Sequence, residues 1–116
     1  MDKTDRTRVP NRVGREEILS YAQRIWQDQD RVTTEIASDA LTIIHKKYEA
    51  EPTFFSGKSM KGIVGGLFYL LGQRYGKFKT QRQIATSLNT TDVTVRASCR
   101  TWTELVQKHY GYAKME

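Results

Sequence analysis

The amino-acid sequence predicts an all-α fold, a single domain of five helices that ends in a helix-turn-helix. Apolar side chains recur three or four residues apart in successive segments, and no segment shows the alternation of a half-buried strand. The chain has 116 residues, of which 38% are hydrophobic, and this is enough for one core without disulfides or a structural metal. We therefore expect one domain over residues 14–110, between a mobile basic arm at residues 1–13 and a short tail at residues 111–116.

The first two helices are predicted from their apolar faces. Residues 15–30 carry one such face, and residues 35–50, which follow Thr33, carry another. The faces comprise Ile18, Tyr21, Ala22, Ile25 and Trp26 in the first helix, and Ile36, Ala40, Ile43, Ile44 and Lys47 in the second.

A central helix is predicted within residues 58–76, which are apolar on nearly every side from Ile63 to Leu71. A helix that is hydrophobic all round is normally surrounded by other helices. The apolar run has nine residues, far fewer than the roughly 20 that a membrane-spanning helix requires. We therefore expect a core helix and no membrane contact.

Glycines interrupt this central helix at Gly62, Gly65 and Gly66. Each costs about 1 kcal/mol relative to alanine within a helix, so we expect a neighbouring helix to approach the backbone closely there. The loop before the helix, residues 51–57, contains a proline and two phenylalanines that we expect to fold back onto the core.

The last two helices are predicted from their caps. Thr80 and Gln83 have the spacing of a capping box, so a helix begins there. Residues 89–91 form the turn, since their polar side chains bond local backbone groups. Thr91 then caps the final helix, and Asp92 places negative charge at the positive end of its dipole.

The final helix has two distinct faces. One is an apolar stripe that must be buried, and the other is a small apolar surface flanked by two guanidinium groups. The stripe comprises Val95, Cys99, Trp102 and Val106, and the outer face comprises Val93, Arg96, Ala97 and Arg100.

The outer face suits entry into the major groove of DNA. An arginine fork matches guanine O6 and N7, and a short apolar side chain touches a thymine methyl. The alternative is an ordinary all-α domain in which Arg96 and Arg100 lie on a solvated surface.

The charge is distributed unevenly along the chain. Residues 1–57 carry nine Lys/Arg against ten Asp/Glu, whereas residues 58–116 carry ten against three. A basic excess around a helix pair is typical of a surface that contacts phosphates. The alternative is that these lysines keep the protein soluble.

Three segments of the sequence resemble one family. The chain is similar, over about residues 15–106, to the cyclin-fold repeat of transcription factor IIB and its archaeal counterpart, most of all to the C-terminal repeat. The segments are Lys58-Ser59 before the apolar run that ends in Leu67-Phe68-Tyr69-Leu70, then Thr80-Gln81-Arg82-Gln83-Ile84-Ala85, then Thr91-Asp92-Val93-Thr94-Val95-Arg96.

The resemblance implies a cyclin-like domain that acts in transcription initiation or its regulation, on double-stranded DNA. It also implies TATA-binding protein and RNA polymerase as partners. We expect the protein in the cytosol, associated with a nucleoid, or in a nucleus. The expected base contacts are Val93, Thr94, Arg96, Ala97 and Arg100, and the expected contacts to the DNA backbone are Lys77, Lys79, Thr80, Gln81 and Arg82.

The chain also departs from the family. One cysteine cannot form a zinc ribbon, and one repeat stands in place of two. Met60 replaces a common proline, and residues 64–67 replace an alanine run. We expect either an excised C-terminal repeat or a stand-alone protein with a single repeat.

Other function classes find less support in the sequence. His45 and His109 have no further ligand at metal-binding spacing, and we find no pair or triad of catalytic side chains, so we expect no metal, no cofactor, no small-molecule substrate and no enzyme activity. Four tyrosines allow stacking on single strands, although aromatics at helical spacing usually pack, and they are Tyr69, Tyr75, Tyr110 and Tyr112. The main alternative is a cyclin-fold adaptor that binds protein without touching DNA.

Overall fold

The computed structural model of the protein describes residues 14–111, and every regular element within them is a helix. The all-α prediction is therefore confirmed for this part of the chain. The predicted arm at residues 1–13 and residues 112–116 of the predicted tail lie outside the described residues. The elements are α1 (Arg15–Trp26), α2 (Arg31–Ala50), the short 3₁₀ helix η2 (Pro52–Phe55), α3 (Met60–Arg74), α4 (Gln81–Leu88) and α5 (Asp92–Tyr110).

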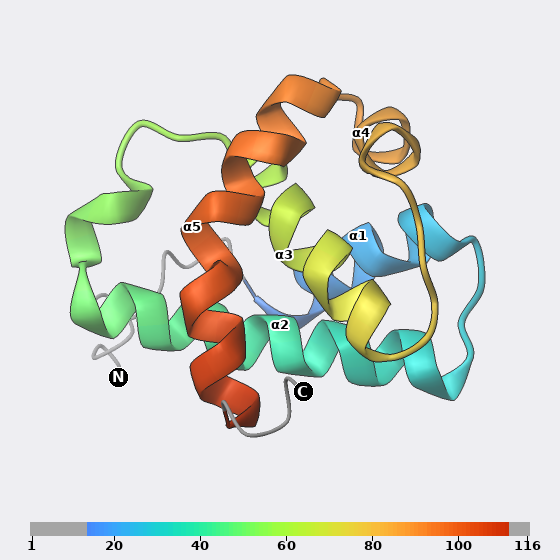
Figure 1. Cartoon of the computed structure of the whole chain (residues 1–116), viewed down its shortest axis with the longest axis horizontal. Coiled ribbons are helices and arrows are strands. Elements are labelled where there is room, and N and C mark those ends of the chain that lie inside the picture. The colour runs from blue at the N-terminus through green and yellow to red at the C-terminus, as the bar shows by residue number, and fades with distance from the viewer. Residues whose placement is uncertain (1–13, 112–116) are drawn as a thin grey trace.

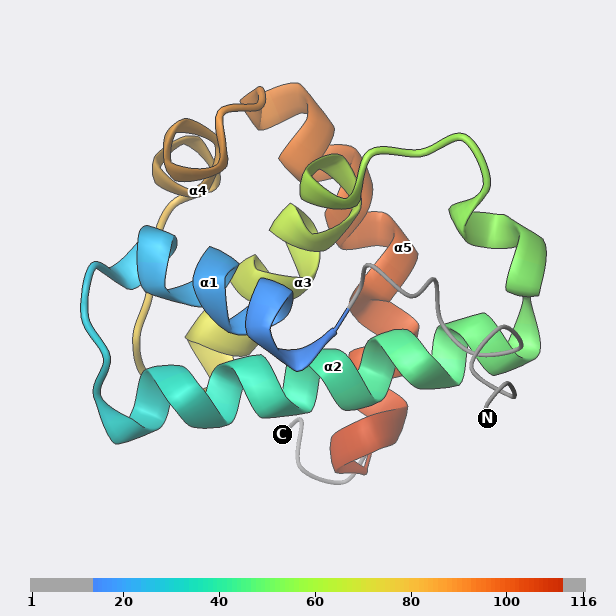
Figure 2. The same cartoon turned by 180° about the vertical axis from the view of Figure 1, so that it is seen from behind.

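Helix α3 lies in the middle of the molecule, as its all-round hydrophobicity predicts. Helix α5 crosses it on one face (Figure 1), and α1 covers the opposite face above the long helix α2 (Figure 2). All residues from Ile63 to Phe68 are buried. The pair formed by α3 and α5 has the most extensive contact between any two helices in the described part of the chain.

The glycines of α3 allow α5 to approach it closely, which confirms the expectation from their cost in a helix. A Cβ atom at Gly66 would lie only 2.2 Å from the backbone nitrogen of Cys99, and one at Gly65 would lie 3.0 Å from Val95 Cγ2. Gly62 is less crowded, since its Cβ would lie 3.3 Å from Thr94 Cγ2. The backbone contact is therefore centred on Gly66.

The junction of α1 and α2 differs from the prediction. Helix α1 ends at Trp26, because Gln27 adopts a left-handed conformation with φ of 57°. Asp30 caps α2 by accepting a hydrogen bond from the backbone N–H of Thr33 at 2.9 Å, so α2 begins at Arg31. The predicted end of the first helix at residue 30 and the predicted start of the second helix after Thr33 are both wrong. Asp28 and Asp30 accept hydrogen bonds within the connection and at the start of α2, so they do not continue α1.

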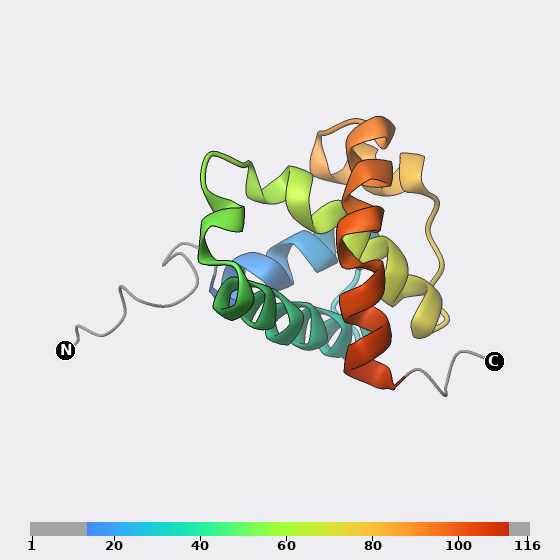
Figure 3. The same cartoon turned by 60° about the vertical axis from the view of Figure 1, so that its left-hand side comes forward.

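The connection from α2 to α3 folds back onto the core, as predicted. It arches through η2 along one side of the molecule (Figure 3). Phe55 is buried, and the ring of Phe54 packs edge-on against Trp102 with centroids 6.2 Å apart. This contact brings the start of α3 beside the middle of α5.

Candidate nucleic-acid interface

Helices α4 and α5 meet at a tight corner whose ends are capped as predicted. The Thr80 hydroxyl accepts from the Gln83 backbone N–H at 3.0 Å, and the Gln83 side chain accepts from the Thr80 N–H at 2.9 Å. Asn89 closes α4 in the left-handed conformation, with φ of 59°. Thr91 caps α5 by accepting from the backbone N–H of Thr94 at 3.1 Å. The two helices are therefore held at a defined angle by local hydrogen bonds.

The rotation of α5 about its own axis is fixed by its hydrogen bonds to α3. Ser98 Oγ donates to the carbonyl oxygen of Ile63 and accepts from the Gly66 N–H at 3.0 Å. The indole of Trp102 donates to the same Ile63 oxygen at 2.7 Å. These contacts turn one side of α5 to the core and leave the other side to solvent.

The inner stripe of α5 is shifted from its predicted position. Val95, Trp102 and Val106 are buried, whereas Cys99 is only half-buried. Ser98 is the buried polar residue instead. The prediction for Cys99 is corrected because α3 approaches at Gly66, beside residues 98 and 99, and the small hydroxyl of Ser98 fits there with partners for its hydrogen bonds.

The outer face of α5 is open to solvent in its first half. Val93 is 63% exposed, and Arg96, Ala97 and Arg100 are also exposed. Neither arginine forms an ion pair within residues 14–111. Thr94 is half-buried, and its hydroxyl accepts from the Thr91 hydroxyl at 2.9 Å. Four of the five residues predicted to contact bases thus lie free on one surface, and the fifth belongs to the helix cap.

The predicted backbone-contact residues of α4 differ in how free they are. Arg82 is exposed, and its guanidinium lies 3.9 Å from the carboxylate of Asp92 at the start of α5. Lys79 precedes the helix and forms no ion pair among the described residues. Thr80 is engaged in the capping box, and Gln81 points its amide at Cys99 Sγ, 3.8 Å away. Arg82 is therefore the cation seen beside α5 on this side, and Lys79 is a cation just before α4 without an ion pair in the described chain.

Lys77, also predicted to contact the DNA backbone, is bound to carboxylates of the α1–α2 connection. Its ammonium lies 2.8 Å from Asp28 Oδ2 and 3.0 Å from Asp30 Oδ2, and it donates to the Thr33 hydroxyl at 2.9 Å. Burial alone would lower its pKa, but these carboxylates raise the pKa of Lys77 above its usual value. The indole of Trp26 also donates to its backbone oxygen at 2.9 Å. Because its charge is already neutralised, we leave Lys77 out of the interface.

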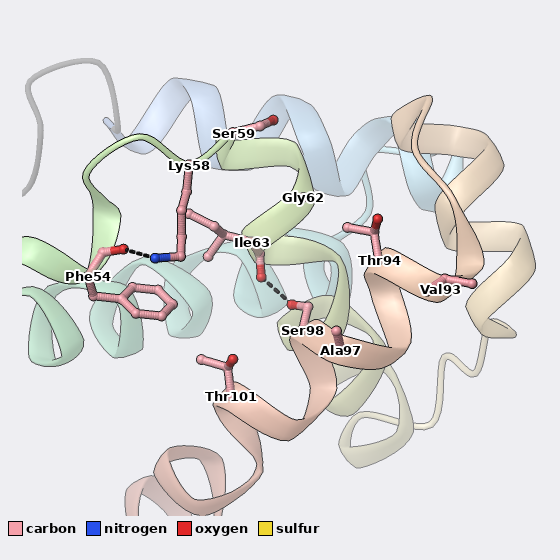
Figure 4. Close-up of a pocket in the computed structure, with 10 residues that line it drawn as sticks. All are labelled: Phe54, Lys58, Ser59, Gly62, Ile63, Val93, Thr94, Ala97, Ser98 and Thr101. Carbon is pink, nitrogen blue, oxygen red and sulfur yellow. Dashed lines mark hydrogen bonds between the residues drawn. The ribbon is translucent and has the colours of Figure 1, made fainter.

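An apolar groove of about 460 Å³ runs along the flank of α5 away from α4, and Val93 and Ala97 of the outer face form part of its lining (Figure 4). Sequence reasoning missed it, because it forms only where η2 and the start of α3 come beside α5. The related signal in the sequence is the pair of phenylalanines at residues 51–57, which predict a loop that folds back onto the core. The groove is lined by Phe54, Lys58, Ser59, Gly62, Ile63, Val93, Thr94, Ala97, Ser98 and Thr101.

Two other kinds of site, a metal centre and a membrane span, were considered for the part of the chain that the structure describes. No three side chains of His, Cys, Asp or Glu gather within residues 14–111 where a metal ion could be held. In the same range no helix is both long and apolar enough to cross a membrane. Burial raises the pKa of the Cys99 thiol. This keeps that sulfur in its less reactive protonated form.

The tyrosines considered for base stacking serve packing where the structure describes them. The hydroxyls of Tyr75 and Tyr110 both donate to Asp39, which joins the ends of α3 and α5 to α2. Tyr69 packs against Phe78 with ring centroids 6.1 Å apart. Tyr112 lies outside the described residues.

Comparison of the chain with protein-family models, with curated protein sequences and with solved structures found no match.

Proposed function

We propose that this chain is a double-stranded DNA-binding module of the transcription factor IIB type, with a cyclin-like fold and a helix-turn-helix made by α4 and α5. In this proposal the first half of α5 enters the major groove, where Arg96 and Arg100 read guanines and Val93 and Ala97 contact thymine methyls. The observation that carries it is the open face of α5, where two arginines without ion pairs in the described chain flank exposed Val93 and Ala97.

The distribution of charge around α5 supports the same proposal. Arg82 lies beside the start of α5, and Lys79 directly precedes the capped start of α4. Both would contact phosphates while α5 contacts bases. The acidic residue of this region, Asp92, is placed at the helix start and faces Arg82. Glu104 is exposed further along α5, and its negative charge would repel DNA. The surface of α5 that suits DNA therefore lies before residue 104.

Selection of bound sequences from a pool of random duplexes at moderate salt tests the proposal. We expect a consensus site to emerge, and repeating the selection with TATA-binding protein tests whether that protein is a partner. Recovery of no consensus, with equal binding to all duplexes, would contradict base recognition by α5.

Arg96→Ala tests the assignment of base recognition to one residue. If Arg96 contacts a guanine, the variant loses about 1 to 3 kcal/mol on the selected site and accepts other bases at one position. Arg24→Ala is the matched control, because Arg24 is also exposed but lies on α1. The assignment is wrong if both variants retain the affinity and sequence preference of the unchanged protein.

A protein-binding adaptor is the second candidate, and the apolar groove favours it. Phe54, Ile63, Val93 and Ala97 all contribute carbon atoms to the groove, which would suit the apolar face of a partner helix. The salt dependence of binding separates the two functions. Each phosphate contact contributes a slope of about −0.9 to a plot of log affinity against log salt concentration, whereas an apolar protein interface depends far less on salt.

A further inference from the structure

The apolar groove beside α5 lies on the side away from α4. On α5 its wall is made by Thr94, Ala97 and Thr101, and across from them lie Lys58 and Phe54 (Figure 4). None of the lining residues is acidic, and Lys58 is the one that carries a charge. The groove therefore combines a carbon-rich floor with a single cation at its edge.

Lys58 is held in place at this edge by Phe54. Its ammonium donates to the Phe54 carbonyl oxygen at 2.8 Å and lies 4.6 Å from the centre of the Phe54 ring. An ammonium has three donors, so this arrangement leaves two of them for an anion. Lys58 forms no ion pair with a carboxylate among the described residues. It is thus a positioned cation whose charge is not neutralised, in contrast to Lys77.

A helix in the major groove lies between two sugar-phosphate backbones. The groove is about 12 Å wide and an α-helix with its side chains is about 10 to 12 Å across, so both backbones come close to its flanks. On one flank, Arg82 lies beside Asp92 at the start of α5, where it would face the first backbone. The opposite flank has no basic residue on α5 itself between Asp92 and Arg96, and Lys58, from another element, is the one charged residue that lines the apolar groove there.

We propose that the apolar groove of the protein takes the sugar-phosphate backbone of the second DNA strand, with Lys58 in contact with one phosphate. This inference rests on the proposed function and adds to it a second row of backbone contacts. The deoxyribose edge presents carbon atoms that match the Phe54 ring and the Thr101 methyl group, and the phosphate matches the free donors of Lys58. Helix α5 then has a cation on each flank, and the phosphate contacts of these cations fix the position of α5 along the DNA major groove.

The test compares Lys58→Gln with the unchanged chain on the selected duplex, at several salt concentrations between 0.1 and 1 M. Loss of one phosphate contact reduces the slope of log affinity against log salt by about 0.9, which corresponds to about an eightfold loss at 0.1 M relative to 1 M. We expect this loss of affinity on every duplex sequence. We expect the Lys58→Arg variant to have the affinity and the salt slope of the unchanged chain. Lys108→Gln is the control, since Lys108 is exposed at the far end of α5 and should change neither quantity.

Because Lys58 also contacts Phe54, the thermal unfolding of each variant is measured beside its binding. The phosphate contact is supported if Lys58→Gln unfolds at the same temperature as the unchanged chain and its slope of log affinity against log salt is smaller by about 0.9. If the unchanged chain binds the duplex selectively and Lys58→Gln keeps both slope and affinity, the inference is overturned while the proposed function stands, and the groove is left to a protein ligand. If the unchanged chain binds no duplex, both proposals are overturned.

Discussion

The hydroxyl of Ser98 accepts a hydrogen bond from the backbone N–H of Gly66 at 3.0 Å, at the point where α5 and α3 come closest. The same hydroxyl donates to the carbonyl oxygen of Ile63. A side chain that bonds to two backbone groups of the neighbouring helix fixes both the separation of the helices and the rotation of α5. The face of α5 that carries Arg96 is exposed because Ser98 holds the other face against α3.

Gly66→Ala should destabilise the protein strongly. The added Cβ would lie 2.2 Å from the backbone nitrogen of Cys99, and a backbone atom cannot move aside without separating the helices. We expect a loss of about 3 kcal/mol in the free energy of unfolding, measured by urea denaturation. Gly62→Ala is the matched control, because its Cβ would meet only the methyl of Thr94 at 3.3 Å. The control should change stability by less than about 1 kcal/mol, since better helix propensity offsets the tighter contact. Equal effects of the two substitutions would contradict the close approach at Gly66.

Ser98→Ala should also destabilise the protein, but less. It removes two hydrogen bonds to α3 without adding volume, and we expect a loss of about 1 kcal/mol. Thr103→Ala on the same helix is the control, because the Thr103 hydroxyl is exposed and bonds only the Cys99 carbonyl of its own helix. Urea denaturation of both variants measures the difference. A Ser98→Ala variant as stable as Thr103→Ala would show that these bonds do not contribute to the packing of α3 and α5.

Local sequence signals predicted the all-α class, several helix ends and the close approach to α3. The capping box at Thr80 and the cap at Thr91 place the ends of α4 and α5 correctly, because capping depends only on residues within one turn. The glycines of α3 predicted a close neighbour, because their cost within a helix requires a compensating contact. The open face of α5 followed from helical periodicity alone.

Features that join distant segments could not be predicted in the same way. Lys77 reads as a free cation in a basic loop, and only the fold brings Asp28 and Asp30 to it from the α1–α2 connection. Likewise, the apolar groove exists only where Phe54 and Lys58 come beside α5. Periodicity gave the buried face of α5 to within one residue, and the choice of Ser98 over Cys99 depended on where α3 approaches.

The ion pair of Lys77 with Asp28 should make stability depend on pH in acid. Hydrogen bonds from Lys77 and then Thr33 lower the pKa of Asp28 to about 2, from the usual value of 3.8. A carboxyl whose pKa is lower in the folded state stabilises the protein above pH 3.8 and loses that contribution as the pH falls towards 2. We therefore expect the difference in unfolding free energy between the unchanged chain and Asp28→Asn to shrink as the pH falls from 5 to 2.

The control for this experiment is Glu49→Gln, because Glu49 is an exposed carboxylate on α2 without an ion pair among the described residues. Its difference from the unchanged chain should stay small throughout the range. A difference for Asp28→Asn that stays constant from pH 5 to pH 2 would show that Asp28 keeps no preferential charge in the folded protein.

Cys99 should react slowly with thiol reagents in the folded protein. Its side chain is half-buried between α3 and α4, and burial raises the pKa of the thiol, against the smaller effect of the Gln81 amide. Since the thiolate is the reactive form, we expect labelling by a disulfide reagent at pH 8 to be several-fold slower than for an exposed cysteine. The comparison is Thr103→Cys in a Cys99→Ser background, which places the thiol one turn further along α5 on an exposed position. Similar rates for the two proteins would mean that α3 and α4 do not cover Cys99, and the packing that orients the outer face of α5 would then be looser than described.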